Sequence, residues 1–324
     1  MKALLCTQFG PPELLEIGDV PSPVAGPGEV VITVKAASVN FPDVLIIQNK
    51  YQFKAEPPFS PGGELTGVVK EVGPGVAGIA PGDRVLAFIS YGAFREEVKT
   101  EARRVIPLPD GMDFNTGAAF LITYGTVDHG LRDRGALKAG ETVLVLGASG
   151  GIGIASIEIA KVLGARVIAC ASDAAKLDAC RQHGADETIN YSTENLRERI
   201  KALTNDRGVD LVVDPVGGSY TDPALRSCAW RGRLLVVGFT TGEIPKIPLN
   251  LTLLKGCSIV GVFWGEFLRR EPQAFAESVT QLGKWYAAGK LKPHITATYP
   301  LDRAAEAIAL MGARRVVGKV VVTM

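Results

Sequence analysis

The sequence predicts an α/β protein with two domains, one mostly antiparallel β and one with a doubly wound parallel sheet. The chain has 324 residues, more than the roughly 250–300 that one hydrophobic core usually serves. Up to about residue 120, short β-type runs alternate with Pro and Gly turns. From about 122 to 262 an apolar strand, a turn and an amphipathic helix recur, which is typical of parallel strands joined by crossover helices.

The antiparallel domain is predicted from three β-type runs: EVVITVKAAS at 29–38, LTGVVKEVG at 65–73 and DRVLAF at 83–88. Turn sequences such as GIAPGD separate them. After residue 263 we expect a helical stretch to Gly289, a helix near 302–311 and a last strand, GKVVVTM. These segments most simply return to the first domain.

The parallel sheet is predicted from four strongly apolar runs, TVLVLGA, ARVIACA, VDLVVD and GRLLVVGF. A weaker run, DETIN, adds a strand, and GCSIVGVF at 256–263 reads as the last one. The intervening helices are expected over 151–164, 174–183, 194–204 and 220–229. The predicted domains are therefore 1–121 with 263–324, and 122–262.

The amino-acid composition limits the kinds of molecule that the protein is expected to bind. Lys plus Arg total 35 and Asp plus Glu 34, so the basic surface typical of a nucleic-acid binder is missing, and a neutral or modestly anionic small molecule fits better. Five scattered cysteines without a C-x-x-C pair argue against a disulfide framework or a cysteine-zinc site, and favour a reduced, cytoplasmic setting. The apolar start MKALL is too short for a signal peptide, and charges interrupt 151–171, so no membrane span is expected.

A glycine-rich loop joins the strand TVLVLGA to the next helix. Its spacing is that of the dinucleotide fingerprint with Ala in place of the first Gly. Glycine lets the backbone approach a pyrophosphate, and the helix N-terminus offers free N–H groups to the phosphates. The predicted cofactor-binding residues of this loop are Ala148, Ser149, Gly150, Gly151, Ile152 and Gly153.

The residues after the second strand of this unit bear on the choice of cofactor. An NAD-preferring site usually has an acidic residue at this strand's end, where the chain has Ala171. Ser172 and Lys176 could contact a 2′-phosphate, which predicts NADPH; Tyr191 follows the next strand. Lys176 could instead be solvated on its helix, and Asp173 or Ser172 could cap that helix.

Five segments together carry a resemblance to a known family: AASVNFPDVLIIQNKY, FSPGGELTGVVKEVGPGV, GDRV, GASGGIG and the closing GKVVV. In order and spacing they resemble the medium-chain dehydrogenase/reductase superfamily, in its zinc-free quinone oxidoreductase branch, which includes the zeta-crystallin-like proteins. The likeness spans essentially the whole chain. It implies a GroES-like antiparallel catalytic domain beside a Rossmann domain, and a homodimer formed through the 256–263 edge strand.

The resemblance also argues against a zinc site. Zinc-containing members have Gly-His-Glu where this chain has Gly63 before Glu64, and a cysteine near residues 38–40, where this chain has Ser-Val-Asn. The four clustered cysteines of a second zinc are missing too. We therefore expect no metal, and for Glu64 either an orienting hydrogen bond or, as the favoured reading, a structural salt bridge.

The resemblance further implies the residues around the reacting ring. Asn40 and Tyr51 would line the acceptor site as catalytic residues, with Asn40 also touching the cofactor. Asn40 could equally cap the helix that begins with Phe41 and Pro42, and Tyr51 could be a half-buried loop aromatic. The other implied cofactor contacts are Thr123, Gly238, Phe239, Thr240 and Arg314.

None of the three histidines predicts a catalytic role. His129 reads as helix packing, while His183 and His294 lie in uninformative positions. No nucleophile elbow or Ser–His–Asp pattern is present, and hydride transfer from a cofactor needs neither.

The sequence thus predicts an NADPH-dependent, zinc-independent oxidoreductase that reduces quinones or related conjugated carbonyls. The alternative is a reductase of enoyl-thioester or 2-alkenal double bonds on the same fold. A less favoured alternative is a non-catalytic, crystallin-like protein that binds NADPH or RNA.

Overall fold

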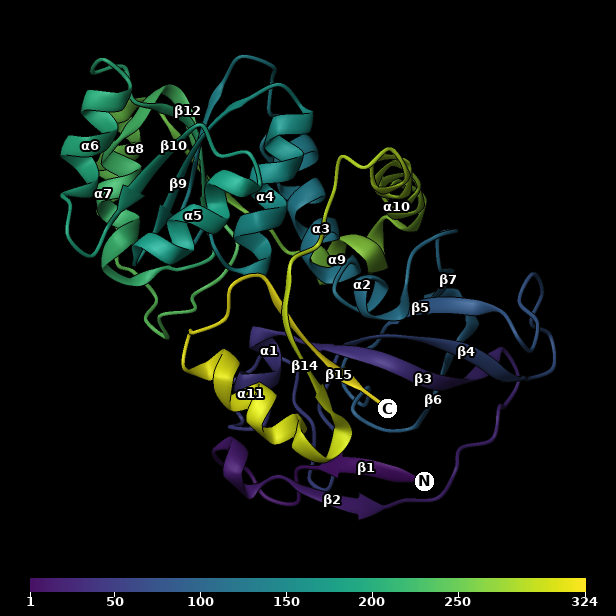
Figure 1. The fold of residues 1–324 in the computed structure, drawn as a ribbon. Coiled ribbons are helices and arrows are strands. Elements are labelled where there is room, and N and C mark those ends of the chain that lie inside the picture. The colour runs from purple at the N-terminus through teal and green to yellow at the C-terminus, as the bar shows by residue number, and fades with distance from the viewer. The chain divides into compact units, whose positions relative to one another are not determined.

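The computed structural model describes all 324 residues, and these form two compact units (Figure 1). The first unit comprises Met1–Ile122 and Ile295–Met324, and the second comprises Thr123–His294. No helix in the structure combines the length and the apolar character needed to cross a bilayer.

The first unit is built around a seven-stranded sheet in the order β14-β15-β3-β4-β5-β7, with β6 also paired to β3. All its pairs are antiparallel except β14 with β15. A separate antiparallel pair is formed by β1 and β2. The strands are β1 (Lys2–Leu5), β2 (Glu16–Asp19), β3 (Glu29–Val39), β4 (Glu64–Val72), β5 (Arg84–Phe88), β6 (Glu97–Glu101), β7 (Val105–Pro107), β14 (Ile295–Pro300) and β15 (Lys319–Thr323).

This unit has its own hydrophobic core, in which alternate residues of β3, including Val30, Ile32 and Val34, pack with Leu65 of β4. Because the C-terminal strand β15 pairs with β3, the end of the chain completes the sheet begun near its start. The helices of the unit are α1 (Phe41–Ile46), α2 (Phe114–Ala118) and α11 (Ala304–Gly312), and one-turn 3₁₀ helices lie at Pro12–Leu14, Ala102–Arg104 and Leu301–Arg303.

The second unit contains a six-stranded sheet in which every pair is parallel. The order is β10-β9-β8-β11-β12-β13, so the direction of strand addition reverses between β8 and β11. Such a reversal leaves a crevice at the carboxyl ends of the two strands, where ligands bind in doubly wound folds. The strands are β8 (Thr142–Val145), β9 (Arg166–Ala171), β10 (Glu187–Asn190), β11 (Val209–Asp214), β12 (Cys228–Val236) and β13 (Ser258–Gly261).

Helices cover both faces of this parallel sheet, as its continuous apolar strands require. One face shares a core with the helices α6, α7 and α8, which lie together in Figure 1. On the other face, Gly130 packs against Leu235, since a Cβ at Gly130 would lie 3.7 Å from the Leu235 side chain, an ordinary van der Waals distance. The helices are α3 (Leu121–Asp128), α4 (Gly151–Val162), α5 (Ala174–Gln182), α6 (Leu196–Leu203), α7 (Thr221–Arg226), α8 (Asn250–Lys255), α9 (Trp264–Arg270) and α10 (Pro272–Ala287), with a π-helical turn at His129–Arg134 and a 3₁₀ turn at Gly218–Tyr220.

Residues 263–294 group with the second unit, whereas the sequence places the second domain boundary at 262/263. The contacts of α9 and α10 with α3 explain this grouping. Trp264 packs on Gly125, where a Cβ would lie 2.7 Å from the indole Nε1, and Ser278 donates a hydrogen bond to Asp128. The sequence could not show which sheet these helices would join.

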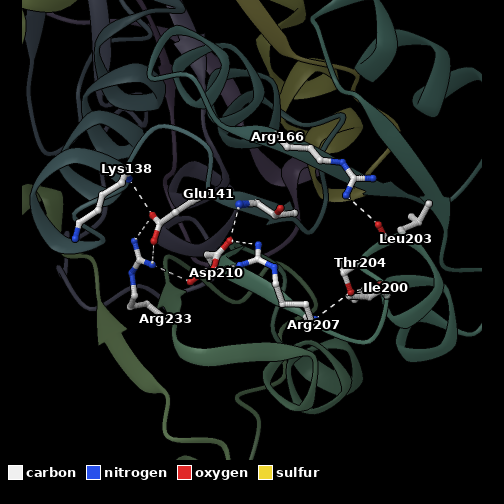
Figure 2. A network of polar contacts seen from close by, with 11 residues as sticks. Lys138, Glu141, Arg166, Ile200, Leu203, Thr204, Arg207, Asp210 and Arg233 are labelled. Atoms are coloured by element: carbon white, nitrogen blue, oxygen red, sulfur yellow. Dashed lines mark hydrogen bonds and ion pairs between the residues drawn. The ribbon is translucent and has the colours of Figure 1, made fainter.

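Charged residues tie together the amino ends of the parallel strands (Figure 2). The Arg233 guanidinium donates to Glu141 at 2.8 and 2.9 Å and to the Gly135 carbonyl oxygen at 2.6 Å. Asp210 accepts from the backbone N–H of Thr142 and from Arg207. The polar side chains at the amino ends of the strands thus bind one another and stabilise the fold. The carboxyl ends of the strands are the edge where a ligand is expected.

Candidate functional site

The loop between β8 and α4 has the geometry of a phosphate cradle. Gly150 is the N-cap of α4 and is extended, with φ −77° and ψ 174°. Gly147 has φ +56°, which turns the chain at the end of the strand. The first N–H groups of α4 therefore face the crevice edge of the sheet without partners inside the helix. A phosphate is the natural acceptor for such groups, because the helix dipole is positive at this end.

Two glycines of this loop show why the spacing is needed. A Cβ at Gly153 would lie 2.4 Å from the carbonyl carbon and oxygen of Ala148, so only glycine lets α4 pack this closely on the strand end. A Cβ at Gly150 would meet no atom nearer than the Gly147 oxygen, at 3.5 Å. Protein atoms therefore do not fill the space beside Gly150, and a ligand can approach its backbone there. These residues fit a dinucleotide pyrophosphate.

Three side chains gather at the end of β9. The Lys176 ammonium donates to the Ser172 hydroxyl at 2.9 Å and lies 3.3 Å from the Asp173 carboxylate. Asp173 is the N-cap of α5, accepting from the Lys176 backbone N–H at 3.0 Å, and this hydrogen bond is the largest cause lowering its pKa. The capping alternative for Asp173 is therefore observed. Lys176 and Ser172 also lie together, as a 2′-phosphate site would need.

Tyr191 lies beside this group of side chains. Its backbone N–H donates to the Ala171 carbonyl oxygen at 3.2 Å, and its ring lies 4.4 Å from the Tyr220 ring, centroid to centroid. Ala171 itself is buried at the strand end. The structure thus places three predicted cofactor contacts, Ser172, Lys176 and Tyr191, around Ala171, the residue that ends β9 without a carboxylate.

A second loop pair lies at the same edge of the sheet, after β11 and β12. The backbone N–H of Gly238 donates to the Asp214 carbonyl oxygen and that of Thr240 donates to the Pro215 carbonyl oxygen, at 3.3 and 3.1 Å. A Cβ at Gly217 would lie 2.8 Å from the Phe239 ring. The predicted residues Gly238, Phe239 and Thr240 are therefore held against the loop that follows β11.

Asp214 organises this loop pair, and sequence reasoning missed it. Its side chain is 3% exposed and accepts from the N–H groups of Val216 and Gly217 and from the Thr221 hydroxyl, at 2.6–2.9 Å. The available signal was an acidic residue ending the apolar run VDLVVD directly before PVGG. Such a carboxylate can satisfy backbone donors of the turn that follows it.

In the first unit, Glu64 is the centre of a buried polar cluster. One oxygen accepts from the Ile122 backbone N–H at 2.8 Å. The other accepts from the Ser38 hydroxyl at 2.8 Å and the Asn40 amide at 3.4 Å, and lies 3.7 Å from the Lys319 ammonium. Glu64 thus makes both kinds of contact expected for it, the orienting hydrogen bond and the salt bridge.

Lys319, the first residue of β15, was not singled out from the sequence. It is 4% exposed, and its ammonium donates to the Asn40 side-chain oxygen at 2.6 Å. Burial lowers its pKa, and the charges of Glu64 and Asp43 oppose that shift. The only signal was a lysine at the start of the apolar run VVVTM, where a long side chain can reach back into a core.

Asn40 and Asp43 form the start of α1. Asn40 is the N-cap residue, and its backbone N–H donates to the Asp43 carboxylate at 2.7 Å, while the Gly62 N–H donates to the other oxygen. Burial nevertheless raises the pKa of Asp43 to about 6. The Asn40 amide is held by Lys319 on one side and by Ser38 and Glu64 on the other. Asn40 therefore occupies the N-cap position of α1 and at the same time has a side-chain amide held in one orientation.

Tyr51 lies near this cluster. Its ring is half-buried and makes an edge contact with Phe53 at 5.7 Å. Burial, and then the charge of Asp43, raises the pKa of its hydroxyl. The phenol is therefore protonated at neutral pH and able to donate a hydrogen bond.

The residues around Glu64 do not fit a zinc ion. No group of three or more His, Cys, Asp and Glu side chains anywhere in the structure is arranged to hold a metal. A Cβ at Gly63 would lie 3.1 Å from the Ile89 carbonyl oxygen, so a larger residue would crowd this position. The positive charge beside the Glu64 carboxylate is supplied by Lys319.

The two remaining predicted contacts stand apart from these loops in the sequence. Thr123 is buried and lies in α3, at the start of the second unit. Arg314 follows α11 in the first unit and has φ +57°. Because they belong to different units, their part in a common site stays a prediction.

All three histidines make structural contacts, including the two to which the sequence assigned no role. His129 stacks on Phe267 at 4.1 Å, as its helix-packing interpretation predicts. His183 and His294, which seemed uninformative, meet at 3.4 Å between ring nitrogens, and His183 also binds the Glu158 carboxylate at 2.7 Å. Glu158 further accepts from the Tyr124 hydroxyl. This chain of contacts anchors the end of the second unit to α4.

The fold defines a two-unit protein of the dinucleotide-binding class. Three features show this: the strand order of the parallel sheet, the glycine loop where that order reverses, and the antiparallel GroES-like sheet. Two family models match the chain. Residues 26–110 match the alcohol dehydrogenase GroES-like domain, and residues 151–283 match the family described as zinc-binding dehydrogenase.

Individual relatives narrow the family. The chain is 38% identical over 324 residues to a quinone oxidoreductase-like protein 2 homolog of Nematostella vectensis, covering 99% of this chain and 88% of that one. It is 35% identical to the quinone oxidoreductase of Rattus norvegicus, covering 95% and 92%. The crystal structure of Escherichia coli quinone oxidoreductase complexed with NADPH matches with a TM-score of 0.93 and 27% identity, over all of both chains.

The chain therefore belongs to the medium-chain dehydrogenase/reductase superfamily, in its quinone oxidoreductase-like branch, and is an oxidoreductase of that family. This confirms the family and the fold class predicted from the sequence motifs.

Proposed function

We propose that this protein is an NADPH-dependent, zinc-independent reductase that transfers a hydride to quinones or related conjugated carbonyls. The observation that carries the proposal is the group at the end of β9, where Lys176 and Ser172 lie together and the strand ends in Ala171. No carboxylate stands at position 171 to repel a 2′-phosphate, and the Ser172 hydroxyl and the Lys176 ammonium would bind it by giving up contacts that they make with each other and with Asp173. The NADPH complex of the Escherichia coli relative supports the same cofactor.

When bound, NADPH supplies the hydride. The backbone N–H groups at the start of α4, after Gly150, would hold its pyrophosphate, and Phe239 and its neighbours would hold its nicotinamide end. In the first unit we assign the acceptor to Asn40 and Tyr51. The Tyr51 hydroxyl donates a hydrogen bond to the acceptor oxygen, and Lys319 holds the Asn40 amide in one orientation.

A quinone suits this arrangement because its reduction requires little beyond correct positioning of the quinone against the hydride donor. After hydride transfer, the negative charge lies on an oxygen, which water can protonate. A 2-alkenal or an enoyl thioester also needs a proton delivered to carbon, whereas the Tyr51 hydroxyl is assigned here to the oxygen of the acceptor. Quinones are therefore the first substrate class, and the double-bond reductase is the second.

Steady-state oxidation of NADPH tests this order. We expect turnover with 1,4-benzoquinone to exceed that with crotonyl thioester and with 2-alkenals. Tyr51→Phe should lower kcat/KM for the quinone by about tenfold, the effect of one lost hydrogen bond to an oxyanion. Faster turnover of the thioester or alkenal would assign the second function. NADPH binding without turnover of any acceptor would favour a non-catalytic protein.

A further inference from the structure

Two cysteines of the second unit come together at the amino ends of neighbouring parallel strands. Cys228 is the first residue of β12 and is fully buried, while Cys257 directly precedes β13 and is partly exposed. The two strands pair in parallel, with Arg233 opposite Ser258. Both cysteines pack in the same apolar cluster. Ligands of a doubly wound sheet bind at the opposite, carboxyl edge.

A fold-back in β12 places Cys228 beside Gly232, whose neighbour Arg231 is hydrogen-bonded to the residue before Cys257. Arg231 has φ +62°, and its backbone N–H donates to the Gly256 carbonyl oxygen at 2.9 Å. The chain turns there so that a Cβ at Gly232 would lie only 3.1 Å from the Cβ of Cys228. The pairing of β12 with β13 begins at the following residues, with Arg233 opposite Ser258. Gly232, which has no side chain, thus lies beside Cys228 and one residue before the start of this register.

The environment makes the two thiols chemically unequal. Hydrogen bonding from the Cys228 thiol lowers the pKa of Cys257 to about 7, with a further contribution from the Lys255 charge. The same hydrogen bond, together with burial, raises the pKa of Cys228. Of the two, Cys257 is therefore the thiol that ionises more readily to the nucleophilic thiolate, and Cys228 is the one that stays protonated.

We propose that Cys257 and Cys228 form a peroxide-reactive dithiol site, in which Cys257 is the attacking and Cys228 the resolving cysteine. The Cys257 thiolate attacks one oxygen of a hydroperoxide, breaking the O–O bond; the sulfur is oxidised to a sulfenic acid and hydroxide or alkoxide leaves. The Cys228 sulfur then displaces hydroxide from the sulfenic acid, and the S–S bond forms. In sum, two thiols and one hydroperoxide give a disulfide, water and water or an alcohol.

The chain provides a matched internal control. Cys170 of β9 and Cys180 of α5 are also close enough for their charges to interact, but both are buried. Burial raises the pKa of Cys180 to about 12 and that of Cys170 still further. Neither is a thiolate at neutral pH, so this pair should stay reduced when the pair at the strand ends oxidises.

The test treats the full-length protein with hydrogen peroxide at pH 7, blocks the remaining thiols with iodoacetamide and maps the peptides by mass spectrometry. We expect a disulfide between Cys228 and Cys257 that dithiothreitol reverses, while Cys170 and Cys180 are alkylated only after denaturation. The oxidation rate should rise with pH as Cys257 ionises, and it should do so at a lower pH than for an ordinary thiol. Cys228→Ser should leave Cys257 to accumulate as sulfenic and sulfinic acid, and Cys257→Ser should prevent oxidation of Cys228.

The wild-type experiment decides the proposal without any variant, so a variant that fails to fold does not block it. Absence of the Cys228–Cys257 disulfide, oxidation of Cys170 and Cys180 at an equal rate, or sulfinic acid on Cys257 with Cys228 still free would each overturn it. The inference does not depend on the proposed reductase activity. Because Cys257 lies in the 256–263 segment expected at the dimer interface, the oligomeric state of each sample is measured by light scattering alongside its oxidation. NADPH oxidation measured on the same samples reports separately whether the protein remains folded.

Discussion

The Lys319 ammonium lies 3.7 Å from the Glu64 carboxylate, and the two side chains are only 5% and 1% exposed. Glu64 is in β4 and Lys319 begins β15, so this ion pair joins strands from the two ends of the chain. A buried charge is costly unless its partner and its hydrogen bonds are all present. Each partner here has other contacts as well, with Ser38 and Ile122 on Glu64 and Asn40 on Lys319.

Removing one partner of this pair should destabilise the protein strongly. We expect Lys319→Met to lower the free energy of unfolding by about 3–5 kcal/mol, because the Glu64 carboxylate is left buried and uncompensated. Urea denaturation measures the change. The control is the pair Lys70–Glu97, in which the Lys70 side chain is 48% exposed, and Lys70→Met should cost no more than about 1 kcal/mol. A Lys319→Met cost as small as that of Lys70→Met would show that the Glu64–Lys319 pair is not needed for stability.

Asp43 should give the protein an unusual dependence of stability on pH. Its pKa is raised from 3.8 to about 6, chiefly by burial, so the folded state binds more protons than the unfolded state between these values. The contribution of this group to stability is therefore greatest below about pH 4 and is lost as pH rises through about 6, by about 2–3 kcal/mol. The measurement is the difference in unfolding free energy between wild type and Asp43→Asn across this range.

A matched control separates this effect from general acid sensitivity. Asp110→Asn, at an exposed position, should follow the wild-type pH profile. If the wild type and Asp43→Asn profiles are parallel, Asp43 has an ordinary pKa and the burial argument is wrong.

The ribose end of the cofactor site should discriminate by charge. We expect Lys176→Glu to raise the Kd for NADPH at least tenfold and hardly change that for NADH, because a charge-assisted hydrogen bond to the 2′-phosphate contributes about 1.5–3 kcal/mol. The loss should shrink as salt screens the contact. Fluorescence titration with both cofactors at two salt concentrations measures it.

Asp173 provides the complementary variant. Asp173→Asn keeps a good N-cap for α5 but removes the negative charge 3.3 Å from the Lys176 ammonium, so NADPH should bind more tightly. Equal losses for both cofactors in Lys176→Glu, or a wild-type preference for NADH, would mean that the ribose end lies elsewhere.

Catalysis should not depend on zinc. The Glu64 oxygens are engaged by protein donors, and no metal-binding group of side chains is present. We expect less than stoichiometric zinc in the purified protein and unchanged NADPH oxidation after treatment with a chelator. Elemental analysis that finds one tightly bound zinc per chain, lost together with activity, would contradict this prediction.

The edge strand β13 should form a dimer interface. Its far side has no partner strand, and an exposed edge invites uncontrolled pairing unless a symmetry mate covers it. Large apolar side chains are also exposed nearby in sequence, including Leu253, Leu254 and Ile259. Light scattering at micromolar concentration should give twice the chain mass, and Ile259→Pro should shift it toward the monomer. A monomer mass for the wild type would refute the interface.

The sequence alone determined the fold class and the phosphate loop. Strand and helix periodicity are local properties, so the runs at 29–38 and 209–214 predict strands without knowledge of their neighbours. The glycine spacing at 148–153 has the same local character, because it describes one turn between one strand and one helix. The strand at 256–263 was predicted for the same reason and is observed as Ser258–Gly261.

Only the tertiary structure decided which distant residues meet. Lys319 is 255 positions from Glu64 in the chain, and nothing near either residue in sequence shows that β15 pairs with β3 and brings the ammonium to the carboxylate. The contact of His183 with His294 depends in the same way on chain segments that are far apart in the sequence. Sequence patterns encode local geometry, whereas burial, pKa shifts and ion pairing arise from neighbours that only the folded chain brings into contact.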